Sequence, residues 1–393
     1  MALSDSLANY FGFEEHGTTL RTEVLAGLTT FLTMSYIVVV NPSILVGIPG
    51  EKPGIVVPGY GPGEVVSMLA VVTIIAAAVA TLIMALYANR PFGQAPGLGL
   101  NAFFAFTVVG ALGIPWQTAL AAVVVEGVIF IALTAAGARE YIIRAFPEPV
   151  KFAVGTGIGL FLAIIGLQAM GIVVDDPATL VQLGPVATDP VAIVSVVGLL
   201  FTFALYARGV RGSIILGIIV TTALGWVVAN AGLVSGDAAG RLVAGGASTT
   251  YDITPLAGAF VTGVADIEAF TFALVVFTFF FVDFFDTAGT LTGVAQIAGF
   301  LDEDGNLPDI DKPLMADAVG TTVGGMLGTS TVTTYIESAS GVEEGGRTGM
   351  TALVVALLFL ASLAVVPLAA AIPLYASHIA LVVIGVVMLG NVV

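Results

Sequence analysis

Cysteine is absent from this chain of 393 residues, and charged side chains are scarce at 10% of the total. Without cysteine there is no disulfide framework and no thiol chemistry. Soluble domains carry roughly 25% charged residues, so this chain belongs to another class of protein. Hydrophobic residues reach 58% and the mean hydropathy is +1.07, values that are typical of a protein with many membrane spans.

Basic residues are also few, with 11 Lys and Arg against 27 Asp and Glu, which gives a net charge of −16. Many of the acids lie in loops, for example Asp302, Glu303 and Asp304, and we interpret them as a solvated surface. This charge balance disfavours a nucleic-acid partner. The two histidines are not paired as metal ligands, and the sequence holds no phosphate loop or zinc motif. We therefore expect no metal, no cofactor and no catalytic residues.

Twelve windows of about 20 apolar residues are long enough to cross the hydrocarbon core of a bilayer. They fall near 22–41, 64–88, 97–112, 116–137, 150–174, 190–207, 212–233, 268–299, 313–328, 330–345, 348–369 and 376–393. The third and the tenth are short and interrupted by Gly, Pro or hydroxyl residues. The N-terminus lacks the pattern of a signal peptide, so we expect the first window to be a retained span. The chain is therefore expected to be an all-α polytopic protein of the lipid bilayer.

The positions of Lys and Arg predict the orientation of the spans. With the N-terminus inside the cell, nine of the eleven basic residues lie in cytoplasmic loops, as the positive-inside rule requires. These nine are Arg21, Arg90, Arg139, Arg144, Lys151, Arg208, Arg211, Lys312 and Arg347, while Lys52 and Arg241 fall outside. The opposite orientation would reverse the count. We expect a multi-pass protein of the cytoplasmic membrane with its N-terminus inside.

Two carboxylates interrupt the apolar run from Ala273 to Leu291. A single carboxylate at the centre of a bilayer costs about 2.5–3.5 kcal/mol on insertion scales, so Asp283 and Asp286 need a compensating environment. With Thr287 and Thr290 they fall at helical positions i, i+3, i+4 and i+7, which form one face. We interpret this polar face as half of a binding site.

The third window contains Pro96, Gly97 and Gly99, which make a continuous helix unfavourable at its start. Irregular backbone at membrane depth is tolerated only where it is buried or lines a cavity. Asn101 then offers an amide and Phe103 an aromatic face, a pair that suits a flat heterocycle. The alternative is that the glycines serve helix packing and that Asn101 ties two helices together.

The tenth window is too polar to face lipid, and its Thr- and Val-rich start favours an extended conformation. The part from Tyr335 to Gly341 predicts a half-helix with Glu337 near its N-terminus. Glu337 is then a candidate for ligand binding, with a structural hydrogen-bonding role as the alternative. Interrupted segments seven spans apart, in corresponding halves of a chain, indicate a transporter with inverted repeats.

Five stretches of this sequence also carry a resemblance to a known family. They are RTEVLAGLTTF (21–31) with NP (41–42), APGLGLNAFF (95–104), VDFFDTAGTL (282–291), TSTVTTYIESASG (329–341) and GGRTG (345–349). The chain resembles, from about Phe11 to its end, the azaguanine-like branch of the xanthine/uracil permease superfamily, which comprises adenine, guanine and hypoxanthine permeases.

The resemblance implies a fold of seven plus seven inverted spans with short strands in the broken spans 3 and 10. It also implies two domains that are discontinuous in sequence. The core domain would comprise 1–149 (spans 1–4) and 267–369 (spans 8–11), and the gate domain 150–233 (spans 5–7) and 370–393 (span 12), with an extracytoplasmic loop at 234–266. The chain stops directly after the twelfth span, so relative to the family we expect the last two spans to be lacking.

The resemblance further implies the roles of individual residues in a transporter of purine bases. The family's base-binding carboxylates fall on Asp286 and Glu337, its polar and aromatic positions in span 3 fall on Asn101 and Phe103, and Thr290 lies one turn beyond Asp286. Asp283 or Asp286 would carry the proton of a purine–proton symporter that works by alternating access. The sequence leaves open the preferred purine, H⁺ against Na⁺ as the coupling ion, and whether the protein forms a homodimer.

Three other functions were weighed against this hypothesis. A uracil or xanthine permease of the same superfamily fits the DTAGTL and YIES strings less well. An intramembrane aspartyl protease needs two aspartates on facing helices, whereas Asp283 and Asp286 share one helix. A channel is harder to exclude from composition, but a carboxylate site in broken helices is better suited to holding a ligand. We therefore expect a transporter and not an enzyme.

Overall fold

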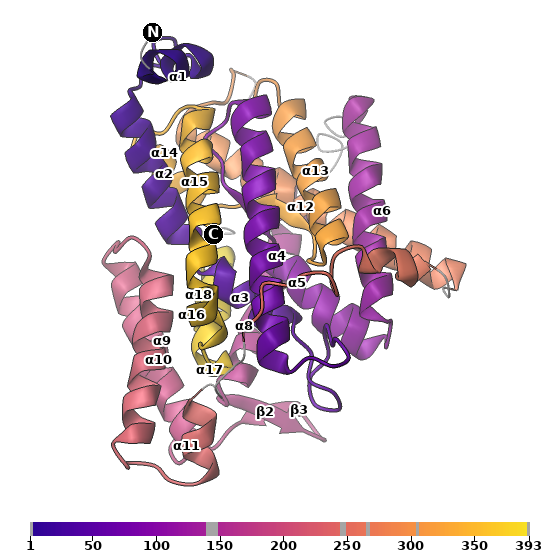
Figure 1. Ribbon diagram of the computed structural model, residues 1–393, viewed down its shortest axis with the longest axis vertical. Helices are drawn as coiled ribbons and strands as arrows, with labels where there is room; N and C mark the ends of the chain where they lie inside the picture. The colour runs from indigo at the N-terminus through magenta and orange to yellow at the C-terminus, as the bar shows by residue number, and fades with distance from the viewer. Residues whose placement is uncertain (1–2, 139–147, 244–248, 265–267, 304–305, 391–393) are drawn as a thin grey trace.

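The computed structural model describes residues 3–138, 148–243, 249–264, 268–303 and 306–390 of a helical protein (Figure 1). The side chains of residues 3, 148–152 and 390 are not described. The expected cytoplasmic residues Arg139 and Arg144, the side chain of Lys151 and the chain end at 391–393 therefore lie outside the described part.

Within that part, seven segments are long and apolar enough to cross a membrane. They are α2 (Leu20–Met34) with α3 (Ile37–Leu45), α4 (Pro62–Ile83) with η1 (Met84–Ala88), α6 (Trp116–Ala135), α9 (Pro190–Ala207), α10 (Ser213–Asn230), α12 (Ala269–Ala298), and α15 (Gly349–Ala361) with η4 (Ser362–Val365) and α16 (Val366–Ala370).

The remaining five windows correspond to shorter or broken elements. These are β1 (Gln94–Pro96) with α5 (Leu98–Ala102) and η2 (Phe103–Ala111), α8 (Glu148–Ala169), α13 (Asp311–Leu327), β4 (Val332–Thr334) with α14 (Ser338–Glu343), and α17 (Leu374–Ser377) with α18 (Ile379–Gly390). Outside the windows lie α1 (Leu3–Phe11), β2 (Val173–Asp176), β3 (Leu180–Leu183), α11 (Asp237–Leu242) and η3 (Ala259–Val264). Each expected span thus has a counterpart in the structure.

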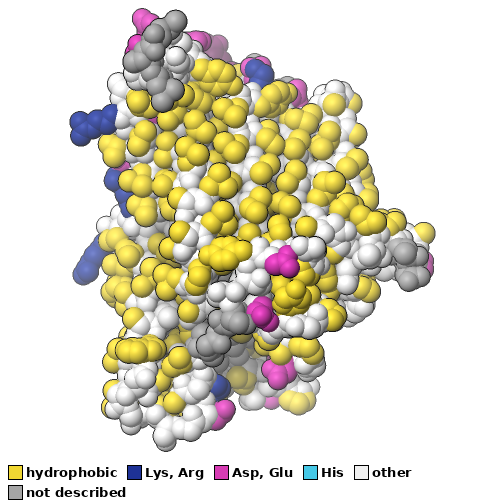
Figure 2. Space-filling model, viewed as in Figure 1, with side chains coloured by type: hydrophobic (Ala, Val, Ile, Leu, Met, Phe, Trp, Pro, Cys, Tyr) yellow, Lys and Arg dark blue, Asp and Glu magenta, His cyan; other side chains and the backbone are white. Residues whose placement is uncertain are grey.

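The outer surface of the bundle is apolar. Figure 2 shows hydrophobic side chains over most of this face, with the charged side chains toward its top, its lower third and its left edge. Large side chains such as Leu200, Phe270 and Trp226 are 63%, 75% and 57% exposed. A surface of this kind suits contact with lipid chains.

The two broken spans meet through their backbones. Strands β1 and β4 pair antiparallel, with Ala95 opposite Thr333. The pairing continues on both sides, since the Gly97 amide donates to the Thr331 carbonyl (2.9 Å) and the Tyr335 amide to that of Gly93 (3.0 Å). This confirms the short strands expected in spans 3 and 10, and it supplies partners to backbone groups that lie inside the bundle.

A buried carboxylate joins the start of α2 to the start of α15. Glu23 is fully buried and accepts hydrogen bonds from the backbone amides of Arg347 (2.9 Å), Thr348 (3.3 Å) and Thr351 (3.1 Å). A carboxylate at a helix N-terminus satisfies amides that have no partner within the helix. The strings RTEV and GGRTG are therefore two halves of one structural contact.

Small residues allow close helix contacts elsewhere in the bundle. Helix α8 packs along α18 where Gly159 faces Gly385, and a Cβ added at Gly385 would lie 2.4 Å from the Gly159 carbonyl oxygen. Helices α9 and α10 meet in the same manner, because a Cβ at Gly198 would lie 2.0 Å from Thr221 Oγ1. Small residues at such crossings let helix backbones approach closely in a membrane.

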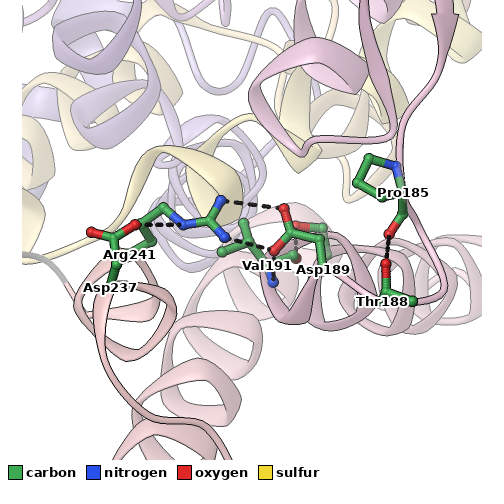
Figure 3. Close-up of polar contacts among 7 residues, drawn as sticks. Pro185, Thr188, Asp189, Val191, Asp237 and Arg241 are labelled. Atoms are coloured by element: carbon green, nitrogen blue, oxygen red, sulfur yellow. Dashed lines mark hydrogen bonds and ion pairs between the residues drawn. The ribbon is translucent and has the colours of Figure 1, made fainter.

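An ion pair fixes α11 against the start of α9 (Figure 3). The Arg241 guanidinium donates to both carboxylate oxygens of Asp189 (3.0 and 3.2 Å) and lies 3.8 Å from Asp237. Asp189 also accepts from the Val191 amide at 3.0 Å, which caps α9. The bidentate geometry holds the loop after α10 to the neighbouring helix.

The Gly159–Gly385 contact yields a stability prediction. We expect Gly385→Ala to destabilise the protein by about 1–3 kcal/mol, because its Cβ meets rigid backbone and α8 must separate from α18. Gly157→Ala is the matched control on α8, since nothing lies within 4 Å of a Cβ there. Thermal unfolding of the purified proteins in detergent measures both. An unchanged melting temperature for Gly385→Ala would show that the contact is looser than described.

Candidate functional site

A cavity of about 190 Å³ lies where the two broken spans face α8, α12 and α18. Pockets for drug-sized ligands occupy about 300–1,000 Å³, so this one suits a smaller molecule. The residues that line it are Tyr36, Gly97, Leu98, Gly99, Gly155, Ile158, Leu162, Phe285, Asp286, Gly289, Thr290, Thr333, Thr334, Tyr335, Ile336, Glu337, Ile384 and Met388. The described part of this lining contains no Lys or Arg, which disfavours an anionic ligand.

Two of the expected carboxylates reach this cavity from opposite elements. Asp286 comes from the middle of α12, with Thr290 one turn later on the same side, and Glu337 directly precedes α14. The short loop after β4 places Glu337 there, as expected for the start of a half-helix. The structure thus brings together Asp286, Thr290 and Glu337.

The polar face of α12 divides between two neighbours, which corrects the expectation of a single site. Asp283 and Thr287 are fully buried, and the Thr287 hydroxyl lies within hydrogen-bond distance of Asp283 (3.2 Å), Asp317 (3.2 Å) and Thr333 (3.0 Å). A stripe of four residues at i, i+3, i+4 and i+7 is broad enough to face two elements. Asp286 and Thr290 therefore face the cavity, whereas Thr287 contacts α13 and β4 and Asp283 lies beside Thr287, outside the cavity lining.

The two expected residues of span 3 lie apart from the cavity lining. Asn101 is fully buried and its Oδ1 accepts a hydrogen bond from the Ser330 hydroxyl. Phe103 packs edge-on against Phe279, with ring centroids 5.0 Å apart. Span 3 contributes the stretch from Gly97 to Gly99 to the cavity instead. The geometry fits the alternative in which Asn101 ties two broken spans together.

Tyr36 was not identified from the sequence. It lies between α2 and α3, lines the cavity, and its hydroxyl donates to Glu337 Oε1 at 2.5 Å. Tyrosines are common in apolar spans, so the sequence offered no reason to single out this one. The only signal is structural, the break in the helix at Ser35 and Tyr36. Asp317 on α13 was also missed, because its partner Thr287 is distant in sequence.

The arrangement can bind a small molecule that donates hydrogen bonds on more than one side. Carboxylate oxygens at Asp286 and Glu337 are hydrogen-bond acceptors when ionised. Ile158, Ile384 and Met388 supply an apolar wall. In the described residues no group of three His, Asp or Glu side chains gathers as a set of metal ligands.

The contact of Asn101 leads to a prediction that separates its two roles. We expect Asn101→Ala to lower the unfolding free energy by about 1–3 kcal/mol, because Ser330 loses its buried acceptor. Ser330→Ala should cause a similar loss, and the double variant should add little to either. If Asn101 instead binds a ligand of this site, Asn101→Ala will raise KM for that ligand while the melting temperature stays unchanged. Thermal unfolding and uptake kinetics on the same variants distinguish these outcomes.

Known proteins resemble this chain over nearly its whole length. A permease from Methanocaldococcus jannaschii is 46% identical, over 98% of this chain and 82% of the relative. The adenine permease AdeP of Escherichia coli is 40% identical over 97% of this chain and 80% of its own length. The guanine/hypoxanthine permease PbuO of Bacillus subtilis is 40% identical, with 97% and 84% covered.

Solved structures with the same fold belong to membrane transporters. The transmembrane domain of the cyanobacterial bicarbonate transporter BicA superposes with a TM-score of 0.68 at 14% identity, covering 94% of this chain and 88% of that one. Murine Slc26a9, an anion transporter in the inward-facing state, gives a TM-score of 0.59 at 12% identity over 94% and 60% of the two chains. At these identities the likeness shows the fold alone, which is the expected seven-plus-seven inverted-repeat architecture.

The family model that matches residues 21–393 is described as a permease family and is that of the xanthine/uracil permeases. Its members are transporters and not enzymes, which argues against the intramembrane protease. The five motifs, the fold and the match over the whole bundle agree, and the chain belongs to the xanthine/uracil permease family of multi-pass membrane proteins.

Proposed function

We propose that this permease imports purine nucleobases across the cytoplasmic membrane, coupled to protons, by alternating access. The observation that carries the proposal is the pair of carboxylates, Asp286 and Glu337, on the wall of one small apolar cavity. Relatives named for adenine and for guanine/hypoxanthine, both at 40% identity, support a purine as the substrate.

Purine bases fit the chemistry of this wall. They are neutral and flat, and they carry an N–H on the imidazole ring and N–H groups on the pyrimidine ring or its substituent. Asp286 and Glu337 accept such hydrogen bonds from two different elements, while Thr290 adds a hydroxyl. Phe285 and the Gly97–Gly99 backbone offer surfaces against which a ring can lie.

The composition of the cavity wall supports alternating access between two domains. Tyr36, Asp286 and Glu337 belong to the proposed core (1–149 and 267–369), whereas Ile158 on α8 and Met388 on α18 belong to the proposed gate (150–233 and 370–393). The polar groups that would hold the base therefore all come from one domain. Movement of the core along the apolar gate wall would carry the base without breaking those hydrogen bonds.

Coupling to protons follows from the charge of the site. A neutral base does not balance the negative charge of the two carboxylates. Like charges in a low-dielectric cavity repel each other strongly. A proton on Asp286 would remove that cost when the loaded core moves, and Asp283, one turn earlier on α12, is the other candidate for carrying the coupled proton. A monovalent cation such as Na⁺ would serve the same purpose, so the coupling ion is decided by experiment.

An N-terminus inside the cell is also part of the proposal. Arg211, in the loop after α9, forms an ion pair with Glu344. Glu344 and Arg347 both lie in the connection between α14 and α15. The Arg347 amide in turn contacts Glu23 at the start of α2. Arg21, Arg211 and Arg347 thus lie at one end of the bundle. The positive-inside rule assigns this end to the cytoplasm.

Uptake in cells that lack their own nucleobase carriers tests the function. We expect cells that express this chain to accumulate radiolabelled hypoxanthine, guanine or adenine, and not uracil, and to lose accumulation when an uncoupler collapses the proton gradient. A sodium-free buffer serves as the control for the alternative ion. Uptake of uracil or xanthine alone would assign the permease to the uracil/xanthine substrates instead. Purine uptake that resists the uncoupler but requires sodium would show that the coupling ion is Na⁺ and not H⁺.

Asp286→Asn tests the coupling residue. The amide cannot take up and release a proton. We therefore expect accumulation of the purine against its concentration gradient to fall at least tenfold, a factor that corresponds to about 1.4 kcal/mol. Asp175→Asn is the matched control, because Asp175 is exposed on β2 and does not belong to the cavity lining. An Asp286→Asn variant that keeps full proton-coupled uptake would overturn this assignment.

A further inference from the structure

We propose that Glu126 on α6 is a positioning residue for the ligand cavity, and that it acts through Thr331 on the backbone of Gly97. The glutamate serves as a hydrogen-bond acceptor and is not itself among the residues that line the cavity. The inference rests on the proposed function and deepens it, since it concerns how one wall of the same cavity is held in place.

Glu126 lies in the middle of an apolar span. Helix α6 contains no other Asp, Glu, Lys or Arg between Trp116 and Ala135, and Glu126 is fully buried. A carboxylate in such a place is costly without a polar partner. The hydroxyl of Thr331, which is also fully buried, donates to Glu126 Oε2 at 3.2 Å. This bond joins span 4 to span 10, between residues 205 positions apart in sequence.

Thr331 in turn holds a wall of the cavity. Its carbonyl accepts a hydrogen bond from the Gly97 amide at 2.9 Å, and Gly97 lines the cavity where span 3 is broken. Gly97 lies close to a proposed ligand group, because a Cβ built on it would be 3.8 Å from Asp286 Oδ2. Two successive hydrogen bonds therefore connect Glu126 to the backbone that faces the ligand.

A second threonine in the same segment provides an internal comparison. Thr329, two residues before Thr331, is fully buried, and its hydroxyl oxygen accepts from Asn41 Nδ2 at 2.9 Å. The Thr329 amide donates to the Gly324 carbonyl of α13 at 2.9 Å, and none of these three residues lines the cavity. Of the bonds described for the two threonines, that of Thr331 is the one that continues to the cavity wall.

Thr331→Val and Thr329→Val make the same chemical change at these two positions. Each removes one buried hydroxyl, so we expect both to lower the melting temperature. Thr331→Val alone should raise KM for purine uptake, by about 3- to 10-fold, the factor that corresponds to one neutral hydrogen bond, while the maximal rate is kept. Equal KM values in the two variants would overturn the proposal, because a loss of stability affects both.

Variants of the glutamate test whether its acceptor or its proton matters. Glu126→Leu removes the acceptor and should reproduce the raised KM of Thr331→Val. Glu126→Gln keeps an oxygen that accepts a hydrogen bond but cannot take up and release a proton, so it should rescue both KM and proton-coupled accumulation. A Glu126→Gln variant that loses accumulation would assign the glutamate to the proton pathway and overturn the positioning role.

The double variant, Glu126→Leu with Thr331→Val, separates positioning from stability. Both partners of the bond are then removed together, so the hydroxyl is not left without its acceptor, and the melting temperature should recover relative to Glu126→Leu alone. KM should stay raised, because the segment that holds Gly97 has still lost its anchor. Recovery of KM together with the melting temperature would show a merely structural role.

A readout that needs no substrate keeps this inference separate from the proposed function. The chain has no cysteine, so Leu98→Cys, on the cavity wall next to Gly97, is a single reporter for a small neutral maleimide. We expect Thr331→Val to change its labelling rate by at least about threefold, the lower end of the same range, and Thr329→Val to leave it unchanged. If this pattern appears while the unaltered protein takes up no purine, the positioning role stands and the proposed function fails. Identical labelling in the two backgrounds would refute the inference and leave the purine function standing.

Discussion

The pairing of β1 with β4 is the constraint on which the rest of this structure depends. Two spans stop being helical in the middle of the bundle, and each would leave amide and carbonyl groups without partners in an apolar surrounding. Because Gln94–Pro96 and Val332–Thr334 pair with each other, those groups are satisfied and two half-helices can start from one point. The cavity lies beside this crossing, and Gly97 and Glu337 reach it directly after their strands. The site is therefore a consequence of how the two breaks are stabilised.

Around that crossing, polar contacts join elements that are far apart in sequence. Glu23 joins α2 to α15, Tyr36 joins the break in span 1 to Glu337, and Thr287 joins α12 to Asp317 on α13. Each of these contacts lies in an apolar surrounding, where unpaired polar groups are costly and fully paired ones specify a single arrangement. The helices α8 to α10 and α18 instead meet through glycine and threonine, at Gly159, Gly198 and Gly385. Directional bonds and close glycine packing thus act together, since Gly127 and Gly349 also make close helix contacts and Arg241 binds Asp189 near α9.

The sequence predicted the features that produce a local anomaly. A carboxylate in an apolar run, such as Asp286 or Glu337, costs free energy unless it lies in a polar site. A proline or glycine in a span, such as Pro96 or Gly97, costs free energy unless the helix is interrupted there. It did not predict features that depend on side-chain direction. Asn101 and Phe103 follow the break at Pro96 and Gly97, yet neither lines the cavity, because Asn101 bonds to Ser330 and Phe103 packs against Phe279. Periodicity alone cannot give the direction in which the side chains of an irregular segment point.

In the proposed transport cycle, the core domain would hold a neutral base while it moves past the gate domain. The structure separates the two requirements by chemistry, because acceptors and hydroxyls line one side of the cavity and Ile158, Leu162, Ile384 and Met388 line the other. An apolar wall makes no directional bond with the ligand. The ligand therefore does not fix the position of one side of the cavity relative to the other. Discrimination between bases must then reside in the polar side alone. Adenine and guanine/hypoxanthine relatives are equally similar to this chain at 40% identity, so overall similarity does not distinguish these substrates, and the few donors and acceptors around Glu337 are where the difference has to be sought.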